Sequence, residues 1–383
     1  MDTITFREHQ QRLVSNIQAI QDLSPSVAEA FLTVPRHPFL SHYYVHRAGT
    51  REWTRYERKE SREWYEHIYK DQPLVTRVDE YGRTLSSSSQ PSVMARMLDV
   101  LDVQAGMKVL EVGTGTGYNA ALLAQLTKDP RFITTIDIDS TALEEARQAL
   151  KEVGNEDGMT IATGDGSAGY HQNAPYDRIV VTASSPHVPL AWMQQLKPQG
   201  ILVCVLQPRY APLGGILKAQ KQEEGLKGQI VGPASFMVLR DEHYAKRNIQ
   251  IDMRASCITS FPHSPSLFPL NLLRENHHFS FFLYKRIPDL HTFQRPKEQE
   301  MIFYQYSSPQ GYLVFNQRTH QVSLYGIRSC AYSIWNQLVS TYSLWLHCGT
   351  PSITQYHFEM EMVDGKQYLS LITSSGNIWP FEE

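Results

Sequence analysis

The chain has 383 residues, of which 42% are hydrophobic and 20% are charged, and these fractions are typical of an ordinary folded protein. Its length predicts two domains, or one domain with a large appendage. The 36 basic and 39 acidic residues leave a net charge of −3, which excludes a nucleic-acid-binding protein that works through bulk charge and favours small molecules or peptides as partners.

The cysteines and the length of the apolar runs indicate the cellular compartment in which the protein is expected. The four cysteines form no CxxC pair and no zinc spacing with histidine, so we expect free thiols, no disulfide framework and no metal site: Cys204, Cys257, Cys330 and Cys348. The N-terminus shows no apolar signal segment, and the longest apolar runs, such as residues 201–206, have the length of a strand. The sequence therefore predicts a cytoplasmic protein that does not engage a membrane.

Residues 1–85 are predicted to form a helical cap region. Apolar residues at three-to-four spacing indicate one helix within residues 6–20 and a second within residues 24–34. The stretch 47–70 mixes charges of both signs with aromatic residues, which is typical of a surface helix with one aromatic face packed on the core.

Four consecutive serines, residues 86–89, precede Gln90 and Pro91 and then a predicted helix through Leu101. A run of serines is often only a flexible linker. This run adjoins the start of a helix, where hydroxyls and free backbone N–H groups together can bind an anion. The residues alone leave both interpretations open.

From residue 107 strands alternate regularly with helices. This order predicts an α/β fold with a doubly wound, mostly parallel sheet, in which ligands bind at the carboxyl ends of the strands. The expected strands are 107–112, 132–137, 159–163, 178–182 and 200–206, and the expected helices are near 117–126, 140–153 and 188–196.

The first of these strands runs into Gly113, Gly115 and Gly117, three glycines at alternate positions. A dinucleotide-binding loop has the spacing GxGxxG, whereas this GxGxG spacing favours S-adenosylmethionine. Thr114 lies within the loop. Glu111 precedes it, and we expect this acid near the cationic methionine end of the ligand.

The second and third strands end on further candidates for cofactor binding. Asp137 and Ile138 end the second strand, where a carboxylate accepts hydrogen bonds from ribose hydroxyls, although Asp139 is a competing candidate. Gly164, Asp165 and Gly166 follow the third strand. They form either a simple turn or a site where Asp165 accepts from an adenine amino group while the glycines let the ring approach.

Residues 84–208 resemble the protein-L-isoaspartate (D-aspartate) O-methyltransferases. The resemblance rests on these pieces, in this order: Thr84-Leu85 with Ser89-Gln90-Pro91, residues 109–118, Gly164-Asp165-Gly166 with Gly169-Tyr170, Ala174-Pro175-Tyr176-Asp177, and Leu196-Lys197-Pro198 with Gly200. Val34-Pro35-Arg36 with Phe39, and residues 69–74, are similar to the N-terminal region of that family. The resemblance covers roughly residues 30–240 and does not reach the C-terminal segment.

This resemblance implies a class I S-adenosylmethionine-dependent methyltransferase core of Rossmann-like fold at residues 86–240. It also implies that Ser89 is the active-site serine that meets the substrate carboxylate, with Ser88 or Ser87 as alternatives because this chain has extra serines. The cofactor is then lined by Gly113, Gly115, Asp137, Asp165 and Gly166. We expect the substrate mouth to comprise Ser87, Gln90, Pro91, Thr182, Ala183 and Ser184.

The implied reaction is methylation of an isoaspartyl or aspartyl carboxylate of a protein or peptide, the ester leading to a succinimide or isoaspartate. A carboxylate is ionised at neutral pH, so this attack needs positioning but no general base. Two roles remain open, namely protein repair and tailoring of a ribosomally synthesised peptide (RiPP) precursor. A non-catalytic peptide-binding module is the alternative from another class, and the glycine spacing disfavours an oxidoreductase.

Residues 241–383 are predicted to form a smaller α+β extension that recognises a peptide substrate. Its expected elements are strands at 279–284, 301–306 and 311–315, a helix at 331–347, and a hairpin over 356–372 that turns at Asp364-Gly365.

Overall fold

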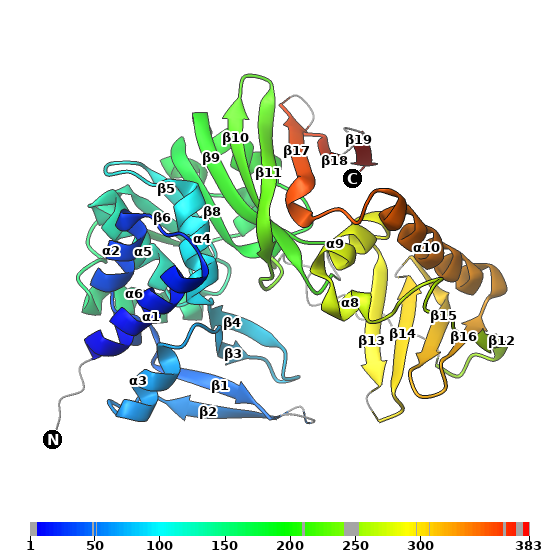
Figure 1. Ribbon diagram of the computed structural model, residues 1–383. Helices are drawn as coiled ribbons and strands as arrows, with labels where there is room; N and C mark the ends of the chain where they lie inside the picture. The colour runs from blue at the N-terminus through cyan, green and yellow to red at the C-terminus, as the bar shows by residue number, and fades with distance from the viewer. Residues whose placement is uncertain are drawn as a thin grey trace.

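The computed structural model describes residues 6–47, 50, 52–208, 211–240, 253–295, 297–305, 307–362, 365–372 and 378–382. Its largest feature is a ten-stranded sheet with the strand order β19-β18-β17-β11-β10-β9-β8-β5-β6-β7 (Figure 1). A four-stranded sheet and a five-stranded sheet lie on opposite sides of it, at the lower left and lower right of Figure 1. No described helix is both long enough and apolar enough to cross a membrane.

One half of the large sheet is parallel and confirms the predicted α/β fold. Its strands are β5 (Val109–Val112), β6 (Ile133–Asp137), β7 (Thr160–Thr163), β8 (Tyr176–Ser185) and β9 (Leu196–Leu206). The helices that alternate with them are α4 (Pro91–Leu101), α5 (Tyr118–Thr127), α6 (Ser140–Glu152) and α7 (Leu190–Gln195), and short 3-10 turns occupy Pro130–Phe132, Gly166–Ala168 and His171–Asn173.

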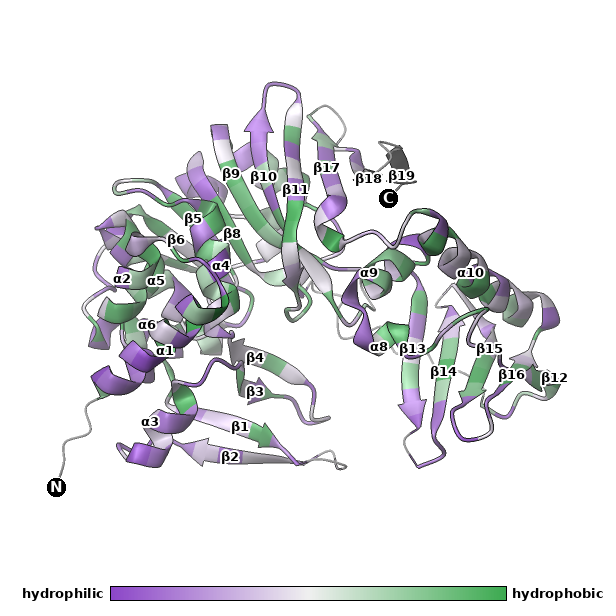
Figure 2. Cartoon of the chain, in the orientation of Figure 1, coloured by the Kyte–Doolittle hydropathy of each residue, from purple (hydrophilic) through white to green (hydrophobic). Residues whose placement is uncertain are grey.

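Both faces of this parallel half are buried. Along β8, Ile179 and Val181 belong to one hydrophobic core, and Val180 between them belongs to a second core on the opposite face. Successive residues of a strand point to opposite faces, so a strand buried on both sides is apolar throughout. Figure 2 shows this as hydrophobic residues along β8 and β9 in the middle of the sheet.

The other half of the sheet is antiparallel and includes the C-terminus. It consists of β10 (Gly214–Gln222), β11 (Gly225–Ala234), β17 (Tyr356–Glu361), β18 (Gln367–Ile372) and β19 (Ile378–Glu382). The hairpin predicted over 356–372 is therefore present, although residue 364 of its expected turn lies outside the described residues. Because β17 pairs with β11, the end of the extension is part of the same sheet as the methyltransferase strands.

The five-stranded sheet has the order β12-β16-β15-β14-β13. Its strands are β12 (Cys257–Pro262), β13 (Leu290–Arg295), β14 (Glu300–Gln305), β15 (Ser308–Asn316) and β16 (Gln321–Gly326), accompanied by α8 (Leu272–Glu275), α9 (His277–Arg286), α10 (Arg328–His347) and the 3-10 turn Ile353–Gln355. The strand predicted at 279–284 is wrong, since these residues form α9. Asn276 caps this helix by accepting from the N–H of Phe279 at 3.0 Å, and residues 279–284 are all buried, which hides the helical period.

The N-terminal region contains strands as well as the predicted helices. The helices are α1 (Phe6–Ile20), α2 (Pro25–Thr33), a 3-10 turn (His37–Phe39) and α3 (Arg62–Ile68), and the sheet has the order β2-β1-β3-β4, with β1 (His42–His46), β2 (Trp53–Glu57), β3 (Leu74–Val78) and β4 (Thr84–Ser88). The helix predicted over 47–70 is wrong for its first part, because residues 53–57 pair with β1 as a strand. The serine run is not a linker, since it forms the edge strand β4.

Candidate functional site

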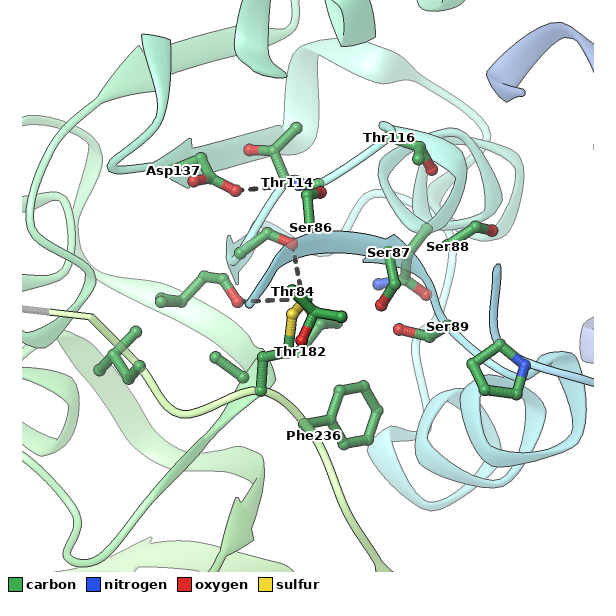
Figure 3. Close-up of a pocket in the computed structure, with 18 of the residues that line it drawn as sticks. Thr84, Ser86, Ser87, Ser88, Ser89, Thr114, Thr116, Asp137, Thr182 and Phe236 are labelled. Atoms are coloured by element: carbon green, nitrogen blue, oxygen red, sulfur yellow. Dashed lines mark hydrogen bonds between the residues drawn. The ribbon is translucent and has the colours of Figure 1, made fainter. Parts of the chain in front are cut away.

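A cavity of about 830 Å³ lies between the carboxyl ends of β5, β6 and β8 and the edge strand β4 (Figure 3). Its size is within the range of small-molecule sites. Twelve of the predicted site residues line it: Ser87, Ser88, Ser89, Gln90, Gly113, Thr114, Gly115, Asp137, Ile138, Gly166, Thr182 and Ala183. Six others do not line it: Pro91, Glu111, Gly117, Gly164, Asp165 and Ser184.

The glycine loop has a left-handed backbone at its three glycines. Gly113, Gly115 and Gly117 have φ angles of 98°, 54° and 85°. A Cβ on Gly113 would lie 2.7 Å from Oγ1 of Thr182, whose hydroxyl donates to the Gly113 carbonyl at 2.6 Å. A Cβ on Gly117 would lie 3.1 Å from Cβ of Ala146 in α6, so this third glycine allows helix packing and is not part of the cavity wall.

Asp137 ends β6 and holds the glycine loop. Its Oδ2 accepts from the N–H of Gly115 at 3.0 Å, and its Oδ1 accepts from the N–H of Asp139 at 3.0 Å. Each carboxylate oxygen keeps a further lone pair for a hydroxyl donor. The competing candidate Asp139 instead caps α6, because its Oδ1 accepts from the N–H groups of Thr141 and Ala142 at 3.0 and 3.1 Å.

Glu111 lies beneath the glycine loop and not in the cavity. It is fully buried, and its two oxygens accept from Asn119 Nδ2 at 2.8 Å and from Thr135 Oγ1 at 2.6 Å. Burial raises the pKa of Glu111 to about 7, while the hydrogen bonds from Thr135 and Asn119 act in the opposite direction. Thr114 Oγ1 lies 2.7 Å from Thr135 Oγ1, so the acid supports the loop through a chain of hydroxyls. Asn119, which the sequence analysis missed, lines the cavity from the first turn of α5.

Of the three candidates that directly follow β7, Gly164, Asp165 and Gly166, only Gly166 lines the cavity. A Cβ on Gly166 would lie 2.5 Å from Cγ1 of Val112, so a side chain would not fit there. Asp165 accepts from the N–H and from the hydroxyl of Ser167, both at 2.8 Å, and so begins a short 3-10 turn. The turn engages Oδ1 of this carboxylate, and a contact of Asp165 with adenine stays a prediction.

The serine strand β4 and the residue after it form the opposite wall. Figure 3 shows the Ser89 hydroxyl directed toward the middle of the cavity and the Ser88 hydroxyl directed away from it. Ser88 is 2% exposed, and its Oγ accepts from Arg36 at 3.2 and 3.4 Å. Between Ser89 and Ser88, the geometry therefore favours Ser89.

Residues 233–240, which comprise the end of β11 and the segment after it, line the cavity on a further side. Ser184 holds this segment: its N–H donates to the Met237 carbonyl at 2.8 Å, and its hydroxyl donates to the Phe236 carbonyl at 3.1 Å. Ser184 is fully buried and does not line the cavity, so the structure contradicts its predicted place at the substrate mouth, whereas Phe236 lines the cavity on this side. Residues 236–239 make the single isolated bridge Ser184↔Val238 with β8.

The ionisable residues that line the cavity are Tyr118, Asp137 and Arg240. The phenol of Tyr118 is 2% exposed, and burial raises its pKa far above its ordinary value. No histidine, lysine, glutamate or cysteine is among the described residues of the wall. The remaining polar groups are mainly hydroxyls, from Thr84, Ser86, Ser87, Ser88, Ser89, Thr114, Thr116, Thr182 and Ser235. Such a cavity can orient a charged group but offers little general-base chemistry.

A glycine loop after a strand of a parallel sheet, faced by a carboxylate at the end of the next strand, is common to dinucleotide-binding folds and class I S-adenosylmethionine-dependent methyltransferases, and the GxGxG spacing favours the methyltransferases. Comparison with protein families agrees. Residues 8–243 match the family described as protein-L-isoaspartate(D-aspartate) O-methyltransferase, and the chain belongs to this family.

Individual relatives show how far the similarity extends. Protein-L-isoaspartate O-methyltransferase 2 of Archaeoglobus fulgidus is 34% identical over 248 residues, covering 64% of this chain and 99% of the relative. A Thermococcus sibiricus protein-L-isoaspartate O-methyltransferase is 39% identical over 246 residues, covering 63% and 98%. A solved structure named protein-L-isoaspartate O-methyltransferase aligns over 94% of this chain and 99% of its own, with a TM-score of 0.56 and 22% identity. The fold likeness thus extends into the C-terminal segment, beyond the sequence resemblance.

The residues present fit the cofactor of this family, S-adenosylmethionine. Gly113, Gly115 and Gly166 bring bare backbone to the cavity wall, a Cβ on Gly113 or Gly166 would collide with Thr182 or Val112, and Asp137 offers acceptors at the strand end. Among the described residues no group of three or more His, Cys, Asp or Glu side chains is placed to hold a metal ion.

Proposed function

We propose that this methyltransferase esterifies the free carboxylate of isoaspartyl or aspartyl residues in proteins or peptides. The observation that carries the proposal is the direction of the Ser89 hydroxyl, which enters a cavity whose described wall contains no histidine, lysine, glutamate or cysteine, and whose one described carboxylate, Asp137, is assigned to the cofactor ribose. Methylation of an amine or a phenol needs a group to take up a proton, whereas a carboxylate is already ionised at neutral pH. The wall is therefore suited to a carboxylate substrate.

The chain's own residues position the reactants. S-adenosylmethionine supplies an electrophilic methyl group on a cationic sulfur. Ser89 donates its hydroxyl hydrogen to one carboxylate oxygen and leaves the other oxygen free to accept the methyl group. Asp137 would hold the ribose of the bound cofactor, and Gly113 and Gly115 would allow the backbone to approach it. Phe236 and the apolar side chains after it exclude water from this side of the cavity.

The ester product then reacts without a further catalytic residue. The backbone nitrogen of the residue that follows the aspartyl unit attacks the ester carbonyl, a C–N bond forms, and methanol leaves with the amide proton. The product is a succinimide, which water opens to aspartate or isoaspartate. In this proposal the protein's chemical task ends with the ester.

We favour broad action on isoaspartyl residues, as in protein repair, over action on one dedicated peptide. A long C-terminal extension alone does not indicate a dedicated substrate, because the fold likeness to a solved protein-L-isoaspartate O-methyltransferase covers 94% of this chain. Tailoring of a RiPP precursor is the second candidate. It is supported by the five-stranded sheet, whose edge strands β12 and β13 offer backbone groups to an extended peptide.

In this scheme residues 1–85 form a cap, residues 86–240 form the catalytic core, and residues 241–383 contribute to substrate recognition. The pairing of β11 with β17 supports such a link, because the segment that leaves β11 is the one that lines the cavity. Hydrogen exchange with and without bound peptide tests this role: protection at residues 257–262 or 290–295 supports it, and protection confined to the cavity wall contradicts it.

The proposed reaction is tested with synthetic peptides that differ at one position. An isoaspartyl peptide, its aspartyl form and its asparaginyl form are incubated with S-adenosylmethionine, and ester formation is followed by mass spectrometry. We expect ester on a carboxylate form and none on the asparaginyl form. Binding of S-adenosylhomocysteine without ester on any carboxylate peptide would refute the reaction. Similar kcat/KM values across unrelated isoaspartyl sequences support repair, and a strong preference for one peptide supports tailoring.

A further inference from the structure

Arg36 is a buried arginine that lies behind the serine strand. It is 0% exposed and follows α2, just before the 3-10 turn His37–Phe39. All of its guanidinium hydrogen bonds within the described residues go to uncharged oxygens, and none goes to a carboxylate. An arginine buried without a carboxylate partner is unusual, because removal of the charge from water is costly unless the surroundings satisfy it.

The hydrogen bonds of Arg36 fall into two groups. On one side the guanidinium donates to the backbone carbonyls of Ile68, Lys70 and Gln72 at 2.7, 3.1 and 3.2 Å. On the other side it donates to the Ser88 hydroxyl at 3.2 and 3.4 Å and to the Ser89 carbonyl at 3.1 Å. One planar group therefore joins the loop 68–72 to the two serines at the cavity.

The same loop also holds the residues after Ser89. Asp71 accepts from the N–H of Ser92 at 2.8 Å and from Nε2 of Gln90 at 3.0 Å, and so satisfies the start of α4. The backbone around Ser89 is thus held on both sides, by Arg36 at the Ser89 carbonyl and by Asp71 at Gln90 and Ser92. A backbone held in this way limits the directions that the Ser89 side chain can take.

We propose that Arg36 is a positioning residue for the carboxylate site, which fixes the Ser89 hydroxyl toward the substrate by holding the Ser88 hydroxyl and the Ser89 carbonyl. This inference rests on the proposed carboxylate methylation. The guanidinium also places a positive charge in a medium of low dielectric behind the serines, which favours an anionic substrate. Burial lowers the pKa of Arg36 to about 10, so the group stays charged at neutral pH.

The test measures kinetics and cofactor affinity for Arg36→Lys in the full chain. Lysine keeps the charge but cannot reproduce the planar set of donors. We expect the KM for an isoaspartyl peptide to rise by about tenfold, as for loss of hydrogen bonds to a charged group. We expect the dissociation constant of S-adenosylhomocysteine, measured by calorimetry, to stay unchanged. A folded Arg36→Lys protein with the KM and kcat of the unsubstituted protein would overturn the proposal.

A double-mutant cycle with Ser89→Ala separates positioning from stability. If Arg36 acts through Ser89, the effect of Arg36→Lys on the peptide KM disappears in the Ser89→Ala background. An effect of equal size in both backgrounds means that Arg36 does not act through Ser89, and overturns the proposal. If Arg36→Lys does not fold, Ser88→Ala removes one contact of the arginine with little change in volume. The same dependence on Ser89 is then expected, and its absence overturns the proposal.

Arg178 supplies a matched control. It is 8% exposed, and its guanidinium donates to the carbonyls of Leu101, Asp102 and Asp177 at 2.7, 3.1 and 3.0 Å, at the start of β8 and away from the cavity. Arg178→Lys should lower stability and leave the peptide KM unchanged. If it raises the peptide KM as much as Arg36→Lys does, the effect is not specific to the serine strand. Failure of the unsubstituted protein to methylate any carboxylate peptide would refute the proposed function itself.

Discussion

The Oδ2 atom of Asp137 accepts a hydrogen bond of 3.0 Å from the backbone N–H of Gly115, which joins the end of β6 to the middle of the glycine loop. The carboxylate thus holds the loop and still has lone pairs for the ribose hydroxyls. Asp137→Ala should raise the dissociation constant of S-adenosylhomocysteine by roughly tenfold to a hundredfold, because each hydrogen bond to a charged group contributes about 1.5–3 kcal/mol. Titration calorimetry measures this.

Asp139 is the matched control for that change. Its carboxylate caps α6, so Asp139→Ala should lower the free energy of unfolding by about 1 kcal/mol and leave the cofactor affinity nearly unchanged. Equal weakening of cofactor binding by the two substitutions would contradict the assignment of the ribose to Asp137.

Ser89→Ala should reduce methyl transfer and preserve the cofactor site. The hydroxyl that enters the cavity is lost, while the carbonyl of residue 89 can still accept from Arg36. We expect kcat/KM for an isoaspartyl peptide to fall by about tenfold or more, with the affinity for S-adenosylhomocysteine unchanged. Ser87→Ala, on the same wall, is the control. Full activity of Ser89→Ala, together with loss of activity in Ser87→Ala, would assign the contact with the substrate carboxylate to Ser87.

The parts of the site that follow strand ends were predictable from the sequence. Gly113, Gly115 and Asp137 lie at the carboxyl ends of β5 and β6, and the alternation of apolar strands with helices is enough to bring such ends together. Their positions depend on local order along the chain and on the rule that parallel strands share an edge. Thr182 and Ala183, by contrast, were predicted from the family resemblance.

Residues whose role depends on distant partners could not be predicted in this way. Ser184 follows Thr182 and Ala183 in sequence, but it forms hydrogen bonds with residues 236–239. It therefore contacts the segment that covers the cavity and does not line the cavity itself. Glu111 precedes the glycine loop, yet its oxygens are taken by Asn119 and Thr135. The helix α9 was hidden because residues 279–284 are buried on every side and show no polar face.

Glu111 should make stability depend on pH. Its pKa in the folded protein is about 7, above its ordinary value of 4.5, so between these values the folded state binds more protons than the unfolded state. The contribution of Glu111 to the free energy of unfolding is fully present below pH 4.5. It is lost as the pH rises to about 7, by an amount on the order of 3 kcal/mol. Glu111→Gln does not titrate. The free energy of unfolding, measured with urea, should therefore fall less between pH 5 and pH 8 for Glu111→Gln than for the unsubstituted protein. Equal falls in the two proteins would contradict the raised pKa.

Gly113→Ala should disable the cofactor site for a reason beyond backbone strain. Gly113 has a φ of 98°, and its Cβ would meet Oγ1 of Thr182 at 2.7 Å, whereas Gly106 has a φ of 77° and no atom within 4 Å of its Cβ. Both substitutions to alanine should cost about 1–2 kcal/mol of stability from the left-handed backbone. Only Gly113→Ala should also displace the loop from Thr182 and abolish measurable binding of S-adenosylhomocysteine. Thermal unfolding and calorimetry on both variants test this, and cofactor affinity kept in Gly113→Ala would show that the loop tolerates a side chain at that position.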